Sequence, residues 1–178
     1  MHTLSHVAFV VSSAARSAAV LSGRGYPAGP TEEFPGEGTR EIYFGDPALR
    51  GRLLLMEPIG DGPYRRALQR RGPGLHHIGL DVENLEAFVD DLGGSGWYLH
   101  PRSLVTLRKS GTAWLARPKG PALIEVRQAG AAGAAFISRL EVPAAPALLA
   151  ALGNDAIASS DELWLTIGRD RFEARDFL

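Results

Sequence analysis

Two segments of this chain repeat one pattern, and this internal repeat constrains the fold more than any other feature of the sequence. The segments are "LSHVAFVVSSAARSAAVLSGRGY", which begins at Leu4, and "LHHIGLDVENLEAFVDDLGGSGW", which begins at Leu75. Each opens with a β-rich apolar run and passes through polar residues. Apolar residues then recur three and four positions apart, which predicts a helix. Glycines follow each predicted helix, as expected where a helix ends.

Strand-like stretches follow both segments. They are "REIYFGD" and "GRLLLMEP" after the first segment, and "TAWLARP" and "PALIEVRQ" after the second. Each copy therefore predicts a β-α-β-β-β module. The sequence predicts an α+β fold in which two such modules, at about residues 1–62 and 72–127, form one domain at residues 1–127.

The rest of the chain contains a weaker third copy. "FISRLEVPAAPALLAALGNDAIA" predicts a strand, a helix rich in Ala and Leu, and a glycine stop, and "ELWLTIG" and "RFEARDFL" alternate like paired strands. Arg139 takes the place of the histidines of the first two copies. The small residues of 128–135 predict a linker, and we interpret residues 136–178 as a degenerate half-module packed on the main domain. The alternative is an arm that completes a dimer.

Composition excludes several classes of protein. The 178 residues suffice for one good-sized domain, and 45% hydrophobic with 22% charged residues is typical of a soluble globular protein. No apolar stretch has bilayer length and no signal peptide is visible, so we expect a cytoplasmic protein without a membrane partner. The absence of cysteine excludes disulfides and thiolate metal sites.

Charge gives little reason to expect nucleic-acid binding, because the formal net charge is −1. One local basic cluster exists in "YRRALQRRG", from Tyr64 to Gly72. It is interpreted either as the solvated surface of a helix or as a docking patch for phosphates on a small ligand.

Histidines at equivalent positions of the repeat are the candidate metal ligands. His6 and His77 occupy the same register, so a pseudo-twofold axis between the modules would make them face each other. Glu125 alternates with apolar residues in "PALIEVRQ", where burying a carboxylate is costly unless it is paired or binds a metal. Two histidines and one carboxylate form a set that suits a divalent cation with open positions. His76 is expected to point to the opposite face of its strand and to support or pack against the site.

The order and spacing of four stretches resemble the vicinal oxygen chelate superfamily, which includes glyoxalases, bleomycin-resistance proteins and extradiol dioxygenases. The stretches are "LSHVAFVV", "EFPGEGTREIYF", "LLLMEPIGDGPYRRALQRRGPGLHHIGLDVENLEAF" and "RPKGPALIEV". Within the superfamily they are most similar to the methylmalonyl-CoA epimerases. The resemblance covers about residues 3–127.

The resemblance implies a metal site and a catalytic carboxylate. Such epimerases bind one divalent ion through a histidine, a Gln or Glu, a second histidine and a glutamate, and His6, His77 and Glu125 match three of these. The remaining ligand falls at Leu54, and the nearby Glu57 is expected on the opposite face. The implied metal is Co, Mn, Zn, Ni or Fe. A catalytic glutamate falls at Glu41, and the resemblance gives Glu125 a possible second role in proton transfer.

Three functions remain open at this stage. The first is an epimerase- or isomerase-like enzyme that removes a proton alpha to a carbonyl or thioester of a small acyl-CoA-like substrate. The second is an Fe(II) dioxygenase that uses the His-His-Glu set, and the third is a non-catalytic small-molecule-binding protein of the drug-resistance type. The resemblance also implies a homodimer.

Overall fold

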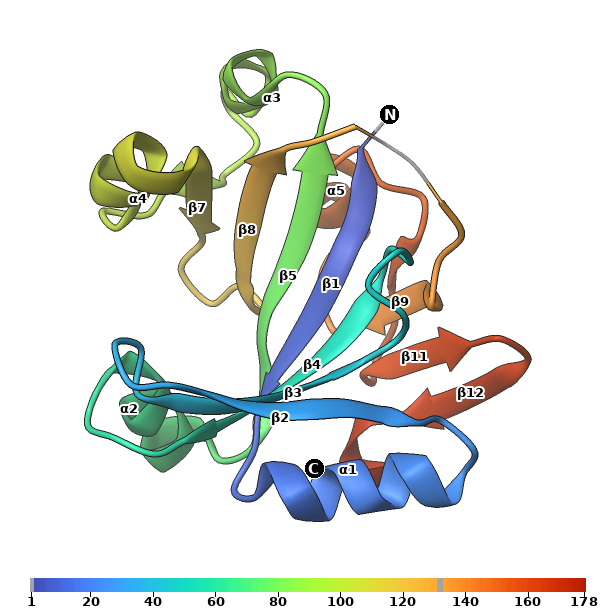
Figure 1. Ribbon diagram of the computed structural model, residues 1–178. Helices are drawn as coiled ribbons and strands as arrows, with labels where there is room; N and C mark the ends of the chain where they lie inside the picture. The colour runs from blue at the N-terminus through green and yellow to red at the C-terminus, as the bar shows by residue number, and fades with distance from the viewer. Residues whose placement is uncertain (1, 131–132) are drawn as a thin grey trace.

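An eight-stranded sheet carries both predicted modules. The computed structural model describes residues 2–130 and 133–178, and the sheet has the order β2-β3-β4-β1-β5-β8-β7-β6 (Figure 1). Its strands are β1 (Thr3–Val10), β2 (Ala28–Phe34), β3 (Thr39–Phe44), β4 (Arg52–Pro58), β5 (Gly74–Val82), β6 (Tyr98–Leu99), β7 (Thr112–Ala116) and β8 (Leu123–Gln128).

The two modules have the same connectivity and meet at their first strands. In each, the first strand pairs in parallel with the fourth, β1 with β4 and β5 with β8. Strands β1 and β5 pair antiparallel, and Val7 lies opposite Ile78 at the centre of the junction. A pseudo-twofold axis therefore passes between these two residues. This arrangement confirms the α+β fold of paired β-α-β-β-β modules.

Capping residues and a proline mark where three of the helices begin. Ser13 and Asn84 cap the first helix of each module by accepting a backbone N–H bond, and Pro63 opens the helix that joins the modules. The helices are α1 (Ala14–Gly23), α2 (Pro63–Arg71), α3 (Leu85–Asp91), α4 (Ser103–Ser110) and α5 (Pro146–Ala150). No helix in the described part of the chain is long and apolar enough to cross a membrane.

One helix was not predicted. Helix α4 interrupts the second module between a two-residue β6 and β7. It ends at Gly111, whose φ of 61° places it in the left-handed region that glycine favours. Its apolar residues Leu104 and Val105 are exposed. The helix therefore lacks the buried apolar stripe by which periodicity reveals a helix.

The C-terminal residues form a second sheet. Its strands are β9 (Ile137–Val142), β10 (Ile157–Ser159), β11 (Trp164–Ile167) and β12 (Asp170–Glu173), in the order β10-β9-β11-β12, and a short 3-10 turn follows at Ala174–Asp176. The order of elements repeats that of the modules, but here the second strand pairs in parallel with the first. Arg139 is exposed and pairs with Glu141. The predicted linker, residues 128–135, includes residues 131 and 132, which lie outside the described residues.

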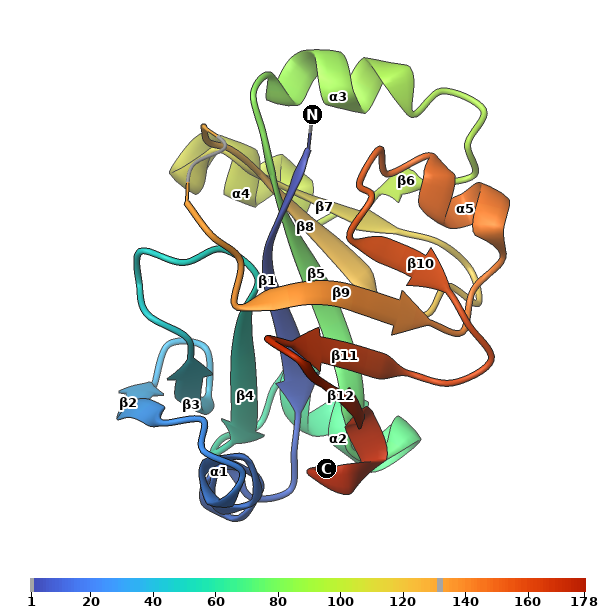
Figure 2. The same ribbon diagram turned by 90° about the vertical axis from the view of Figure 1, so that its right-hand side faces the viewer.

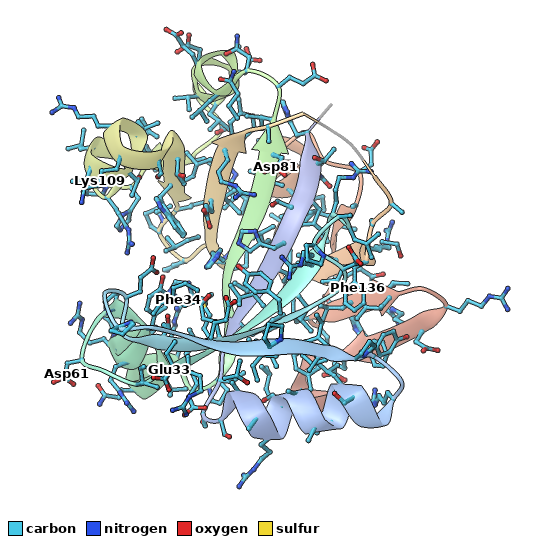
Figure 3. All side chains as sticks on the ribbon, viewed as in Figure 1. Glu33, Phe34, Asp61, Asp81, Lys109 and Phe136 are labelled. Atoms are coloured by element: carbon cyan, nitrogen blue, oxygen red, sulfur yellow. The ribbon has the colours of Figure 1, made fainter. Side chains whose placement is uncertain are left out.

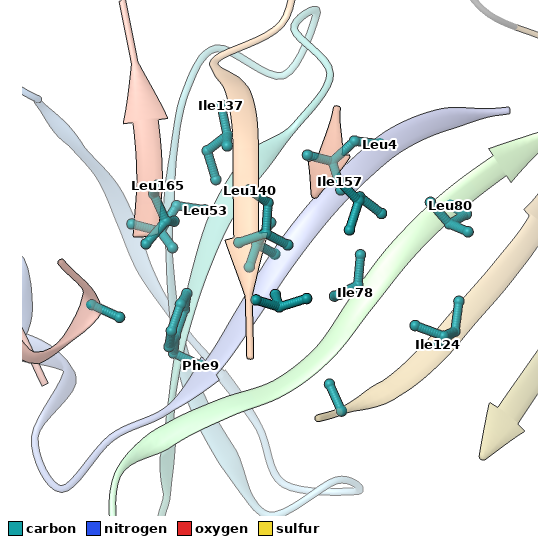
Figure 4. Packing of buried hydrophobic residues seen from close by; sticks show 14 of the residues in the cluster. Leu4, Phe9, Leu53, Ile78, Leu80, Ile124, Ile137, Leu140, Ile157 and Leu165 are labelled. Atoms are coloured by element: carbon teal, nitrogen blue, oxygen red, sulfur yellow. The ribbon is translucent and has the colours of Figure 1, made fainter. Parts of the chain in front are cut away.

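The two sheets share one apolar core. Figure 2 shows the four-stranded sheet lying across one face of the eight-stranded sheet. Figure 4 shows Phe9 and Ile78 of the large sheet packing with Leu140 and Leu165 of the small one. The indole of Trp97 also donates a hydrogen bond to the carbonyl oxygen of Leu148 in α5. The C-terminal sheet thus covers one face of the large sheet, and the site lies on the other.

Candidate metal centre and active-site cavity

Three side chains from three neighbouring strands converge on one point. The Nε2 atoms of His6 on β1 and His77 on β5 are 2.9 Å apart, and each lies 3.4 Å from Oε2 of Glu125 on β8. Two donors about 2.1 Å from one ion lie about 3.0 to 3.4 Å apart when the angle between them is between square and tetrahedral. The spacing of the three donor atoms therefore fits one small divalent ion.

The register of the strands brings the three ligands together. His6 lies opposite Gly79 on β5, and Gly79 lies opposite Glu125 on β8. A Cβ atom built at Gly79 would come within 2.3 Å of ring atoms of His6. Glycine inside a strand often marks such a close approach. The imidazole of His6 thus occupies the space that a side chain at position 79 would fill.

A β-bulge precedes each histidine ligand. Ser5 in β1 and His76 in β5 have no partner in the β1–β5 ladder, which shifts register at both places. The bulges are related by the pseudo-twofold axis. The expectation that His76 points to the opposite face is therefore wrong, because the bulge turns its ring toward that of His77. In the structure, Leu4 and Val7 face one core although an odd spacing of three residues separates them, because the bulge at Ser5 lies between them.

The bulged residues contact the ring nitrogens that face away from the centre. Ser5 Oγ lies 3.4 Å from Nδ1 of His6, and Nδ1 of His76 lies 2.9 Å from Nδ1 of His77. Such contacts fix the orientation of a metal-binding imidazole and leave its Nε2 for the ion. Burial lowers the pKa of His76 to about 4 and holds the pKa of His77 well below its usual value. His77 is therefore neutral at neutral pH, the form that binds metal.

The three ligands open onto a cavity of about 510 Å³. Glu41 and Tyr43 of β3 line it, as do Phe34 and Asp81, which are labelled in Figure 3. Oε1 of Glu41 accepts a hydrogen bond of 2.8 Å from the Thr39 hydroxyl. Burial raises the pKa of Glu41, although the hydrogen bond from Thr39 opposes the shift. The cavity therefore holds a carboxylate with a raised pKa beside the candidate metal centre.

Leucine occupies the position related to Glu125 by symmetry. Leu54 lies opposite Ala8 in β1, as Glu125 lies opposite Gly79 in β5, and Ala8 and Gly79 are equivalent in the repeat. The Leu54 side chain lines the cavity. Glu57 does not replace it, because its carboxylate accepts hydrogen bonds from the backbone N–H of Ala14 and from Arg40. The described chain therefore offers three donors at this centre, and the pattern of four is incomplete.

Comparison with known proteins agrees with this architecture. A sequence model described as the glyoxalase/bleomycin resistance protein/dioxygenase superfamily matches residues 5–114. The chain belongs to this superfamily. No match was found among curated proteins. The predicted superfamily resemblance is thereby confirmed.

Several solved structures resemble this chain in fold over about three quarters of its length. A hypothetical protein from Bacillus halodurans C-125 has a TM-score of 0.56 at 20% identity, over 74% of this chain and 97% of its own. A methylmalonyl-CoA epimerase from Mycobacterium tuberculosis has a TM-score of 0.54 at 22% identity, over 72% of this chain and 89% of its own. Another methylmalonyl-CoA epimerase has a TM-score of 0.52 at 22% identity, over 72% and 95%.

Within this superfamily fold, two aromatic residues flank the centre in ways the sequence did not reveal. Trp114 of β7 lies opposite Glu125, and its ring meets that of His77 edge-on at 5.1 Å. Tyr43 takes the equivalent place opposite Leu54, and burial raises its pKa to about 12. The guanidinium of Arg102 lies 5.6 Å from the Trp114 ring. These residues form the walls of the cavity, and only their cross-strand register identifies them.

Proposed function

We propose that this superfamily member is a metal-dependent enzyme that removes a proton alpha to a carbonyl or thioester, in the manner of an epimerase or isomerase. The observation that carries the proposal is the convergence of His6, His77 and Glu125, all within 4.8 Å of one another, on the cavity that Glu41 lines. The epimerase names of two fold neighbours support an acyl thioester as the substrate class.

The three converging residues would hold one divalent ion, which we propose to be Co, Mn, Zn, Ni or Fe. When bound, such an ion supplies Lewis-acid polarisation of a carbonyl oxygen. The remaining chemistry belongs to the chain. Glu41 accepts the alpha proton, and its raised pKa brings it closer to the operating pH of the enzyme. Thr39 fixes one carboxylate oxygen of Glu41. We assign the returned proton to Glu125, whose carboxyl oxygen that does not hold the ion would carry it to the opposite face of the alpha carbon.

Hydrogen exchange tests the proton-transfer step. We expect the protein, loaded with metal, to exchange the alpha hydrogen of methylmalonyl-CoA into deuterated water. Glu41→Gln should slow this exchange by about 10²- to 10⁴-fold without loss of metal. Glu162→Gln is the control, because Glu162 is exposed and does not line the cavity. Equal exchange rates in the Glu41→Gln variant and the wild type would refute the assignment.

Elemental analysis tests the metal site separately. We expect about one divalent ion per chain in the wild type and none in His77→Ala. A wild-type protein that binds no metal after reconstitution would overturn both the site and the catalytic proposal.

A second function is favoured by one observation. With Leu54 at the fourth position, the donor set is two histidines and one carboxylate, the set typical of Fe(II) oxygenases. Oxygen consumption with catechols in the presence of Fe(II), without hydrogen exchange, would support this alternative. Tight binding of a small molecule that a chelator does not affect would instead support a non-catalytic binding protein.

We also propose that the protein is a cytoplasmic homodimer. Sedimentation velocity measures the mass in solution, and a species of 19.1 kDa would contradict the dimer. Cell fractionation tests the location.

A further inference from the structure

A second cavity adjoins the first. Its volume is about 500 Å³, and it lies between helix α2 and the segment that leads into α4. Tyr64, Arg102 and Trp114 line both cavities and so form their common wall. The second cavity therefore begins where the cavity at the metal centre ends.

The charged side chains that line this second cavity are all basic. Arg70 and Arg71 come from the last turn of α2, and Arg102 and His100 come from the segment before α4. Among the described residues that line it, none is Asp or Glu. None of the three arginines forms an ion pair within the described part of the chain. Like charges gathered in a concave site attract anions.

A simpler interpretation explains part of this arrangement. Basic residues in the last turn stabilise a helix through its dipole, which accounts for Arg70 and Arg71 alone. It does not account for Arg102, which belongs to a different element and faces the same cavity. Guanidinium groups that converge from separate elements are typical of phosphate recognition.

We propose that this second cavity binds the phosphate groups of the same substrate whose carbonyl lies at the metal centre. The inference rests on the proposed function and narrows its substrate to an acyl thioester of a phosphorylated carrier. Pro63, Ala67 and Leu123 provide apolar contacts for the neutral part of such a molecule. The basic stretch from Tyr64 to Gly72 is thus divided: Arg70 and Arg71 face the ligand, while Arg65 donates to the carbonyl oxygen of Pro58.

Calorimetric titration with inorganic pyrophosphate tests the anion site without the metal. The protein is kept metal-free with a chelator, because pyrophosphate also binds divalent ions. We expect pyrophosphate to bind the wild type and His77→Ala equally. The double variant Arg70→Ala/Arg71→Ala should bind at least about tenfold more weakly, since two charge-assisted contacts are lost. The charge-matched control is Arg66→Ala/Arg108→Ala, two exposed arginines that do not line the cavity.

Two substrates separate failure of this inference from failure of the proposed function. Methylmalonyl-CoA carries phosphates, and the N-acetylcysteamine thioester of methylmalonate does not. We expect Arg70→Ala/Arg71→Ala to raise KM about tenfold for the first and to leave KM for the second unchanged. Equal pyrophosphate affinity in the variant and its control, or an equal change in KM for both thioesters, would overturn the inference. Absence of hydrogen exchange with both thioesters would overturn the proposed function. The pyrophosphate titration would then still decide whether the second cavity binds anions.

Discussion

Gly79 lies where an added side chain would collide with a candidate metal ligand. The residue lies between His6 and Glu125 in the ladder, on the face that carries the ligands. The sequence indicates His6 and His77 through their equivalent positions in the repeat and Glu125 through its place among apolar residues, whereas Glu41 follows only from the family resemblance. The sequence does not indicate Gly79 and Ser5, because their roles depend on register and on a bulge that strict alternation does not predict.

Substitution of Gly79 tests this contact. Gly79→Ala should displace the His6 ring and weaken metal binding by about 10- to 100-fold, the loss typical when support for a ligand is removed. Gly74→Ala in the same strand is the control, because a Cβ there meets nothing within 4 Å. Metal affinity measured by competition with a chromophoric chelator compares the two. Unchanged affinity in Gly79→Ala would show that His6 is not a ligand.

The pH dependence of exchange should report the raised pKa of Glu41. The ionised carboxylate is the base, so the exchange rate falls as pH decreases through this pKa, which lies above 4.5. Thr39→Val removes the hydrogen bond that lowers the pKa, so the acidic limb should move to higher pH. Thr31→Val, on the exposed strand β2, should leave the acidic limb of the pH–rate profile unchanged. A limb that does not move in Thr39→Val would contradict the role of Thr39.

The same pKa has a consequence for stability. Because the folded-state pKa of Glu41 is raised above 4.5, its favourable contribution is present below that pH and is lost as pH rises through the folded-state value. Glu41→Gln should therefore melt at a higher temperature than the wild type at neutral pH. The difference should vanish below about pH 4.5, and calorimetric scans at both pH values measure it.

At the scale of the elements, the repeat predicted the modules but not their departures from symmetry. Helix α4 was not predicted because Arg102 at its start provides no side-chain cap and its apolar residues face solvent. The strand order of the C-terminal sheet was not predictable either. The stretches of 136–178 give the order of elements along the chain, whereas the pairing of β9 with β10 depends on where α5 packs.

Leu140 tests whether the C-terminal sheet is integral to the fold. It is 0% exposed in β9 and packs into the core shared with the large sheet. Leu140→Ala should lower the free energy of unfolding by about 2 to 5 kcal/mol. Leu104→Ala is the control, since Leu104 is 76% exposed on α4. Urea denaturation measures both, and a Leu140→Ala variant as stable as the control would mean that this sheet packs only loosely.

At the scale of the whole molecule, the large sheet separates two functions by its faces. One face is sealed by α1, α3, α5 and the C-terminal sheet around the main core. The other carries the candidate metal ligands and both cavities, with only a small cluster of apolar residues around Tyr64. The face that carries the candidate site is thereby backed by the main core.

Metal binding should stabilise the entire chain, because the three ligands come from both modules. An ion present at a hundredfold excess over its Kd would add about 2.7 kcal/mol to the free energy of unfolding. Removing the ion with a chelator should lower the melting temperature of the wild type. In His77→Ala the chelator should have no effect, and an equal shift in both proteins would show that the ion binds elsewhere.

Leu54 occupies the position equivalent to Glu125 in the other module, and this difference makes a nearly symmetric site asymmetric. Around a true twofold axis, a ligand could lie in either of two reversed orientations with the same contacts. Here one side of the centre offers Glu125 and the other offers Leu54, so the two orientations differ in energy. A substrate at this centre would consequently bind in only one of the two orientations, and a single aliphatic side chain would select it.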